Sequence, residues 1–338
     1  MIKNRYKELV LKADEGITFK ICEGEEGQVI VRALNHFGKG SVYSKNYVEP
    51  PIPEGYKHIE GKWHNGFVIE RCSDGSQFVW VPVGFLDSDG TLDGDVFIEK
   101  FGRRNFMSNK YNQLYGTFYA EDEFSEEGYY EELNEELAEQ LESVKKYGGF
   151  YISRYNISKG SNGKPQSVKG FLPWVDIRFA EVKELAASIE NSEAIRSHLT
   201  YGAEYDSVLA WFIKSKARTA EEIAVDSEGW GYYFHSKPLP PYNIPGGPWE
   251  PIKIIETGRY EKWCTHNIYD FAGNVGEWTQ EQYGEECDED ECEALKYDNH
   301  VIRGNCYKYP SSSGHPVGYR NDSGNIKYTG FRAVLCIK

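Results

Sequence analysis

The segment 267–278, Asn-Ile-Tyr-Asp-Phe-Ala-Gly-Asn-Val-Gly-Glu-Trp, places two carboxylates, Asp270 and Glu277, beside aromatic side chains. A carboxylate that packs against rings loses its hydration, so each must accept hydrogen bonds or contact a cation if it is buried. Gly273 and Asn274 stand between them, and both residue types tolerate a positive φ. The segment therefore predicts a tight turn, anchored by its aromatic residues in a loop-rich core.

Thiols are the second group of reactive side chains. The seven cysteines stand at positions 22, 72, 264, 287, 292, 306 and 336, and no C-x-x-C spacing occurs. Their odd number and wide scatter argue against a zinc ribbon and against a full disulfide framework. We expect free thiols, as in a protein made in a cytoplasm, although Cys287 and Cys292 could pair.

The elements that position these groups can be read from periodicity. Strands are predicted at 17–22, 27–33, 66–70, 77–82, 149–155 and 330–337. Helices are predicted at 131–146, 177–187 and 203–214, and Gly148 is the expected stop of the first helix. The segments 66–70 and 77–82 should form a hairpin that turns at 73–76.

A proline-rich spacer divides the chain. Three prolines between positions 50 and 53 favour an extended linker, so we place a β segment at 1–49, a linker at 50–55 and the main domain at 56–338. Residues 28–44 resemble the last two strands of a fibronectin type III or related Ig-like module. A whole module needs about seven strands. A truncated module, a module completed by another chain and an unrelated hairpin all remain open.

Composition excludes several classes of protein. The chain has 338 residues, with 38 Lys and Arg against 53 Asp and Glu, and a formal charge of −15. Such an acidic protein repels phosphate backbones, so we expect no nucleic-acid binding. No apolar run is long enough to span a bilayer, so we expect no membrane insertion. No apolar stretch follows the basic N-terminus, so we expect no secretory signal peptide.

The segment from Asn267 to Thr279 resembles the signature of the formylglycine-generating-enzyme family, also called the sulfatase-modifying factors. That signature contains A-G-N-V-W-E-W-T, and Gly276 departs from it where the first Trp usually stands. Five further segments resemble family landmarks in the same order, namely 78–82, 149–155, 199–205, 301–306 and 330–332. The resemblance covers roughly residues 64–338 and implies an α+β, loop-rich fold of the C-type-lectin type.

The resemblance also implies a calcium region. Family members often bind calcium here through side-chain and backbone oxygens, and the matching positions are Asn274 and Glu277. Asn267 and Asp270 are candidates for a second site. The alternative is that these four residues satisfy turns and buried backbone groups without any metal.

The same comparison argues against the family's oxidase chemistry. The copper-dependent members use two cysteines between their R-G-G-S and G-F-R motifs, because a cuprous ion prefers thiolate ligands. The corresponding window here, 305–329, contains only Cys306. An iron-dependent branch carries its histidines in a separate helical domain, which residues 1–55 cannot supply. We therefore expect a non-catalytic member that requires no cofactor, apart from a structural calcium ion if one binds.

The family resemblance includes non-catalytic binding proteins, namely phage tail adhesins and the variable proteins of diversity-generating retroelements. Their variable residues lie between the same two motifs. Here the window 305–325 is rich in Tyr, Ser, Gly, Asn and His, a composition typical of antibody-like contact surfaces. The predicted ligand-binding residues are Tyr307, Tyr309, Ser312, His315, Tyr319 and Asn321. The alternative is a plain polar loop.

These observations favour a phage or phage-like tail protein that binds a host cell-surface glycan or protein. Such a protein would be made in a bacterial cytoplasm without a signal peptide and displayed on the virion, in contact with other tail subunits and as a homo-oligomer. Two alternatives stay open. One is a structural decoration or baseplate protein, and the other is a metal-dependent oxidase with an unrecognised metal site.

Overall fold

The computed structural model describes residues 9–12, 17–23, 29–35, 50–83, 101–106, 117–118, 129–236, 253–284, 299–313, 315–321 and 326–338. At the N-terminus, β1 (Leu9–Lys12), β2 (Ile17–Glu23) and β3 (Val29–Asn35) form an antiparallel sheet in that order. The two predicted strands are therefore confirmed. Residues 36–44 lie outside the described part of the chain, so the comparison with half an Ig-like module stays a prediction, as does the division at 50–55.

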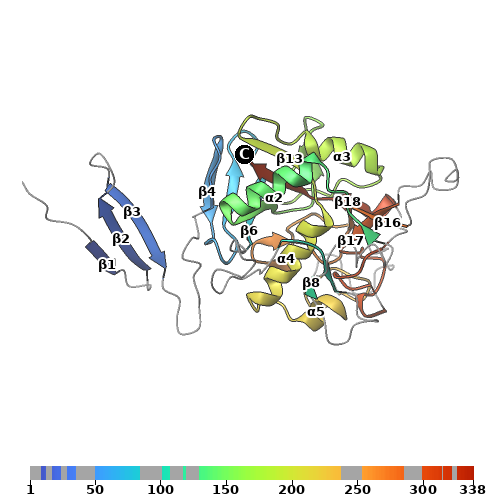
Figure 1. Ribbon diagram of the computed structural model, residues 1–338. Coiled ribbons are helices and arrows are strands. Elements are labelled where there is room, and N and C mark those ends of the chain that lie inside the picture. The colour runs from blue at the N-terminus through green and yellow to red at the C-terminus, as the bar shows by residue number, and fades with distance from the viewer. Residues whose placement is uncertain are drawn as a thin grey trace, which may run out of the picture.

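A six-stranded sheet forms the centre of the main domain (Figure 1). Its order is β13 (Ile195–Leu199), β19 (Ala333–Ile337), β10 (Gly149–Ser153), β6 (Gln77–Pro82), β5 (Val68–Arg71) and β4 (Tyr56–Glu60). All neighbouring pairs are antiparallel. The predicted hairpin is confirmed, because Ile69 of β5 pairs with Phe78 of β6.

The C-terminal segment is divided between two sheets. The prediction of one strand over 330–337 is wrong, because β18 (Thr329–Phe331) and β19 are separated at Arg332. β18 runs parallel to β16 (Gly276–Tyr283), whereas β19 enters the six-stranded sheet. The side chain of Arg332 is fully buried at this junction and needs a buried partner there, so the chain leaves one sheet and enters the other.

The second sheet carries the motif residues. β16 pairs with β17 (His300–Arg303), with β18, and at its far end with β9 (Tyr129–Tyr130). Three two-stranded pairs complete the sheets of the described residues: β7 (Arg104–Asn105) with β8 (Thr117–Phe118), β11 (Ser158–Lys159) with β12 (Pro165–Gln166), and β14 (Cys264–Thr265) with β15 (Ile268–Tyr269).

Four α-helices pack around these sheets in the described part of the chain: α2 (Glu135–Tyr147), α3 (Phe179–Ala187), α4 (Gly202–Lys214) and α5 (Ala220–Ala224). The three predicted helices are confirmed, with boundaries within four residues. Single 3₁₀ turns occur at Glu261–Trp263, Ser311–Ser313 and Ile326–Tyr328. No described helix is both long enough and apolar enough to cross a bilayer.

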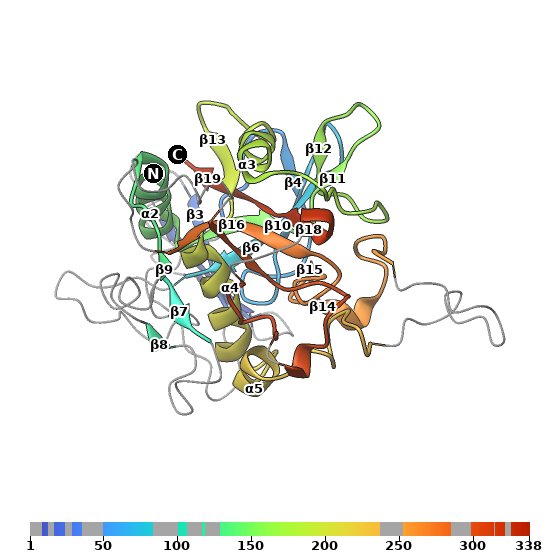
Figure 2. The same cartoon turned by 90° about the vertical axis from the view of Figure 1, so that its right-hand side faces the viewer.

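The alternation of side chains along the strands explains the layers. One face of the central sheet, with Val79, Val81, Ile152 and Val334, belongs to the same core as α4. The other face, with Phe78, Trp80, Tyr151 and Leu335, belongs to the same core as α3. Because consecutive strand residues point to opposite faces, one run of apolar residues supplies both cores. The result is a mixed α and β architecture with helices on both faces of the sheet (Figure 2).

Candidate functional site

The turn predicted in the signature segment is present. Gly273 has φ 77° and Asn274 has φ 62°, and a Cβ on Gly273 would lie 2.2 Å from the carbonyl oxygen of Tyr232. The backbone is also left-handed at Asn267 and Asp270, where φ is 66° and 53°. Asn and Asp adopt this conformation more readily than other residues with side chains, which explains these residue types at three positions of one loop.

The two carboxylates of the signature segment bind different donors. Glu277 Oε1 accepts hydrogen bonds from Arg332 Nε at 2.8 Å and from Asn156 Nδ2 at 2.7 Å. Asp270 Oδ2 accepts from Gly258 N at 2.7 Å and from Thr257 Oγ1 at 3.0 Å. The donors that two buried carboxylates require are therefore supplied by the protein itself.

Burial makes Glu277 and Asp270 bind a proton more readily. Burial raises the pKa of Glu277 to about 7, although Arg332 opposes the shift, and nearby Asp270 adds to it. Burial also raises the pKa of Asp270, against hydrogen bonds from Gly258 and Thr257. One guanidinium faces two buried carboxylates, so the pair binds a proton more readily than exposed carboxylates do.

The two predicted amide ligands hold loops together. Asn274 Oδ1 accepts from Ile255 N and Asn274 Nδ2 donates to Ile255 O, both at 3.1 Å. Asn267 Nδ2 donates to Gly66 O at 2.8 Å, and Asn267 Oδ1 accepts from Arg154 Nη2 at 3.3 Å. The polar atoms of these two side chains therefore bind backbone groups and Arg154.

Three buried oxygen atoms of the carboxylate cluster accept no hydrogen bond within the described part of the chain. Among the described residues, Asp270 Oδ1, Glu277 Oε2 and Asn156 Oδ1 have no hydrogen-bond partner. Carboxylate and amide oxygens are the ligands that calcium prefers. No group of three or more His, Cys, Asp or Glu side chains placed to hold a metal ion occurs among the described residues, and calcium at these oxygens stays a prediction.

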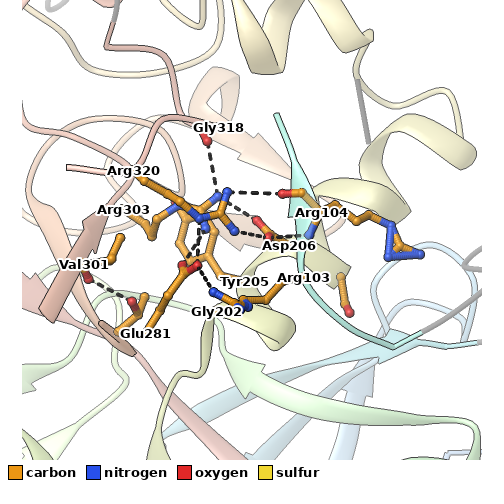
Figure 3. Close-up of polar contacts among 12 residues, drawn as sticks. Arg103, Arg104, Gly202, Tyr205, Asp206, Glu281, Val301, Arg303, Gly318 and Arg320 are labelled. Carbon is orange, nitrogen blue, oxygen red and sulfur yellow. Dashed lines mark hydrogen bonds and ion pairs between the residues drawn. The ribbon is translucent and has the colours of Figure 1, made fainter. Parts of the chain in front are cut away.

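A second buried cluster was not found from the sequence. Asp206 of α4 and Glu281 of β16 face three arginines, and all five side chains are fully buried (Figure 3). Asp206 contacts Arg303 Nη2 at 2.7 Å and Arg320 Nη2 at 2.5 Å. Glu281 Oε1 contacts Arg320 Nε at 2.8 Å and Arg103 Nη1 at 2.9 Å. We call these five residues the arginine cluster.

The arginine cluster fixes the predicted ligand-binding window at two points. Arg303 ends β17 just before the window, and Arg320 lies near its end. Burial alone would raise the pKa of Asp206, but Arg303 and Arg320 outweigh that effect and hold it below its usual value. Asp206 is therefore a carboxylate that binds both arginines. The sequence signal for this cluster was the presence of two acidic residues, Glu204 and Asp206, within the apolar helix predicted at 203–214.

The structure corrects the assignment of Tyr307 as a surface contact. Only 5% of its surface is exposed, and its ring packs between Tyr232, with ring centres 5.9 Å apart, and Tyr328, with ring centres 5.8 Å apart. Tyr307 belongs with Trp263 and Ile255 to a small apolar core beneath the loops. Composition favoured a contact role, but an aromatic neighbourhood buries the ring.

Three other predicted window residues do gather at the surface. Tyr309 is 45% exposed, its ring stacks on His315 with centres 5.7 Å apart, and His315 meets the edge of Tyr319 at 5.4 Å. Ser312, which follows Tyr309 closely in the sequence, is also exposed. Phe234, which the sequence did not single out, is 49% exposed and its backbone N–H donates to Tyr309 O at 3.2 Å. We call these five residues the Tyr309 surface.

Asn321 plays a backbone role. Its N–H and C=O pair with Ile302 of β17 at 3.0 and 2.8 Å. Its side chain is half-buried. The residue therefore ends the window by returning the chain to the second sheet. Residues 314 and 322–325 of the predicted window lie outside the described part of the chain.

The two buried thiols of the described part of the chain are poorly suited to act as ligands. Cys72, Cys264, Cys306 and Cys336 are free, and the last two are buried. Burial raises the pKa of Cys336 to about 11 and also raises the pKa of Cys306 above its usual value. A buried thiol with a raised pKa stays protonated near neutral pH, whereas nucleophilic attack and metal binding need the thiolate. Cys287 and Cys292, which could pair, lie outside the described residues.

Comparison with known proteins identifies a family for part of this chain. No curated protein matches it. Residues 248–337 match the family model described as the sulfatase-modifying factor enzyme 1-like domain. The match spans the signature segment, β16 to β19 and the predicted window, while the resemblance over 64–247 stays a prediction. Residues 248–337 of this chain therefore form part of a domain of the formylglycine-generating-enzyme, or sulfatase-modifying factor, family.

Proposed function

We propose that this protein is a non-catalytic binding protein with a C-type-lectin-like fold, and that it contacts its ligand through the Tyr309 surface. The observation that carries this proposal is the chain of ring contacts that runs from the exposed Tyr309 to the half-buried His315 and Tyr319. Large rigid rings give contact area at little cost in conformational entropy, and neighbouring Ser side chains add adaptable hydrogen bonds.

Buried contacts hold the segment that carries the Tyr309 surface, and they support the proposal. Arg303 and Arg320 bracket the segment that carries Tyr309, and both bind the buried carboxylate of Asp206. Ser311 is also held, because its Oγ accepts from Ser227 N at 2.6 Å and its N–H donates to Glu228 Oε1 at 3.2 Å. A loop fixed in this way loses little freedom when a ligand binds, which favours affinity.

The number and burial of the cysteines support the proposal that the protein has no oxidase activity. The window contains one cysteine, Cys306, where copper-dependent members of the family use two. Its side chain is 5% exposed, and burial raises its pKa above the usual value. Cys336 lies in a different sheet, in β19. This arrangement favours a packing role for both thiols.

The setting we propose is a phage or phage-like tail. An N-terminal β segment, a proline-rich spacer and a terminal binding domain suit a fibre or baseplate protein that displays its tip to a host cell surface. The ligand would be a surface glycan or protein, and further contacts would join the protein to other tail subunits and to copies of itself. A structural decoration or baseplate protein is the alternative, and it would bury the Tyr309 surface in the assembly.

A binding assay tests this proposal. The purified protein is applied to a glycan array and to immobilised envelope extracts from a panel of bacteria. We expect saturable binding that the double variant Tyr309→Ala, Tyr319→Ala weakens about tenfold or more, as expected for loss of aromatic hot-spot residues. Tyr283→Ala is the matched control, because Tyr283 is 39% exposed but lies at the end of β16. Full binding by the double variant would reject this surface.

A metal titration tests the oxidase alternative. Copper(I) and iron(II) are each added without oxygen, and a cysteine-containing peptide is then supplied with oxygen. We expect no tight binding of either metal and no conversion of the peptide cysteine. Stoichiometric metal binding together with peptide oxidation would overturn the non-catalytic assignment.

A further inference from the structure

A surface pocket is lined by none of the residues of the Tyr309 surface or of the arginine cluster. It has a volume of about 560 Å³, and it is lined by the loop 170–175 together with Lys159 and Glu256. Lys159 ends β11, whose hairpin with β12 stands at the edge of the molecule (Figure 2). Pockets of this size are typical of sites for small molecules.

The wall of the pocket is apolar and exposed. Phe171 and Leu172 are 42% and 56% exposed, and Trp174 is half-buried beside them. Two adjacent large apolar side chains in solvent carry a cost in hydration free energy that a ligand would relieve. Exposed apolar patches rimmed by polar groups commonly mark binding sites.

The loop that carries these side chains is held in place. Gly170 N donates to Thr257 O, and Thr257 N donates to Phe171 O, both at 2.9 Å. Trp174 N donates to Ile157 O at 2.8 Å. These bonds tie both ends of the loop to neighbouring segments, so the pocket exists before a ligand arrives.

The unbalanced charge at the pocket is positive. Glu256 is neutralised by Arg259, whose Nη1 lies 2.6 Å from Glu256 Oε2. Lys159 Nζ lies 4.8 Å from the ring centre of Trp174, and no carboxylate of the described residues lies within ion-pair distance of it. The ammonium group is therefore held over an aromatic ring at the edge of an apolar pocket.

We propose that this pocket binds a ligand with an apolar body and a terminal carboxylate. The carboxylate contacts Lys159, and the apolar body covers Phe171 and Leu172. Such a group occurs on free aliphatic acids and at the C-terminus of a peptide that ends in an apolar residue. The pocket shares no lining residue with the Tyr309 surface. Rejection of one proposal therefore does not reject the other.

The test is a calorimetric titration of the full chain with matched probes. Octanoate is compared with octanamide, and N-acetyl-Gly-Leu is compared with its C-terminal amide. We expect at least one acid to bind saturably and about fivefold more tightly than its amide, the size of an exposed ion pair. Saturation by octanoate alone identifies free acids as the source, and saturation by the peptide acid alone identifies a chain terminus.

Three variants separate the charge from the apolar wall. Lys159→Met should bind acid and amide equally, whereas the double variant Phe171→Ser, Leu172→Ser should bind both more weakly than wild type. Lys164→Met, a change at another exposed lysine of the same hairpin, should leave the preference intact. Circular dichroism checks that each variant is folded. No saturable binding of either acid, equal binding of acid and amide by wild type, or an undiminished preference in Lys159→Met would overturn the proposal.

Discussion

Glu277 and Asp270 show how one cation can be shared by two buried acids. Arg332 Nε binds Glu277, and the same guanidinium also donates to the carbonyl oxygens of Ser153 and Tyr269. The arginine therefore secures the loop backbone as well as the carboxylate. Because one positive charge serves two acids, the cluster responds to pH.

The first prediction concerns this pH response. The pKa of Glu277 is raised to about 7 by burial, above the 4.5 of a free side chain. The folded protein thus holds the proton more tightly than the unfolded chain, so this group's contribution to stability is full below about pH 4.5 and is lost as the pH rises through 7. Glu277→Gln cannot titrate, so its stability relative to wild type should increase between pH 5 and pH 8.

Urea unfolding at several pH values measures this difference, with the exposed Glu142→Gln as control. Parallel stability curves for wild type and Glu277→Gln would contradict the prediction. Calcium provides a second readout, because it binds ionised carboxylates. If Asp270 and Glu277 hold calcium, the ion should stabilise wild type more at pH 8 than at pH 5 and should have no such effect on Glu277→Gln.

The second prediction separates two tyrosines that stand two positions apart. Tyr307 is buried between Tyr232 and Tyr328, so Tyr307→Ala should lower the free energy of unfolding by about 3 kcal/mol, as for other buried aromatic residues. Tyr309→Ala removes an exposed ring and should change stability by less than about 0.5 kcal/mol. Thermal and urea unfolding test both, and equal effects would contradict the burial pattern.

At the scale of elements, α2 is defined by its ends. Asn134 Oδ1 accepts from Leu137 N at 3.0 Å at the start, and Gly148 ends the helix with φ 79°. Acidic residues occupy the first turn and lysines the last, which suits the helix dipole. The end of α2 at Gly148 was predicted correctly, because a glycine that ends a helix can be recognised from neighbouring residues alone. The predicted start was four residues early because the charged pattern continues beyond the cap.

The third prediction follows from this cap. Asn134→Ala removes the hydrogen bond to Leu137 N and the one from Tyr201 Oη, which lies 3.1 Å from Asn134 Oδ1. We expect a loss of about 1 kcal/mol in the free energy of unfolding, the usual value for an N-cap. Glu142→Ala, on an exposed position of the same helix, is the control and should cost about 0.3 kcal/mol. A cap variant as stable as this control would contradict the assignment.

At the scale of the whole molecule, the arginine cluster joins segments that are far apart in sequence. Arg103, Asp206, Glu281 and Arg303 come from four separate segments, among them α4, β16 and β17, and they meet in one buried site (Figure 3). Buried ion pairs add little net stability compared with an apolar core, but the loss of one partner leaves an uncompensated charge. The cluster therefore specifies how these segments are arranged.

The fourth prediction tests this role. Asp206→Asn keeps the shape of the side chain but leaves Arg303 and Arg320 without their shared carboxylate, so we expect a loss of about 3–5 kcal/mol in the free energy of unfolding. Glu142→Gln, which breaks a surface pair with Lys145, should cost less than about 0.5 kcal/mol. Urea unfolding measures both. A small effect for Asp206→Asn would mean that the arginines find other partners.

Local patterns accounted for the helices, the hairpin of β5 and β6, and the turn at Gly273 and Asn274. These features depend on residues close in sequence, so periodicity and backbone preference suffice to predict them. The long signature from Asn267 to Thr279 also pointed to the family, and the match at residues 248–337 confirms it.

Long-range packing decided the rest. The break at Arg332 depends on Glu277, and the burial of Tyr307 depends on Tyr232, and neither partner is near in sequence. The sequence by itself determined three helices, the hairpin of β5 and β6, the turn at Gly273 and Asn274, and to which family the C-terminal part belongs. Only the tertiary structure decided which tyrosines face solvent and which acids face arginines, because burial depends on neighbours that the chain brings together only when it folds.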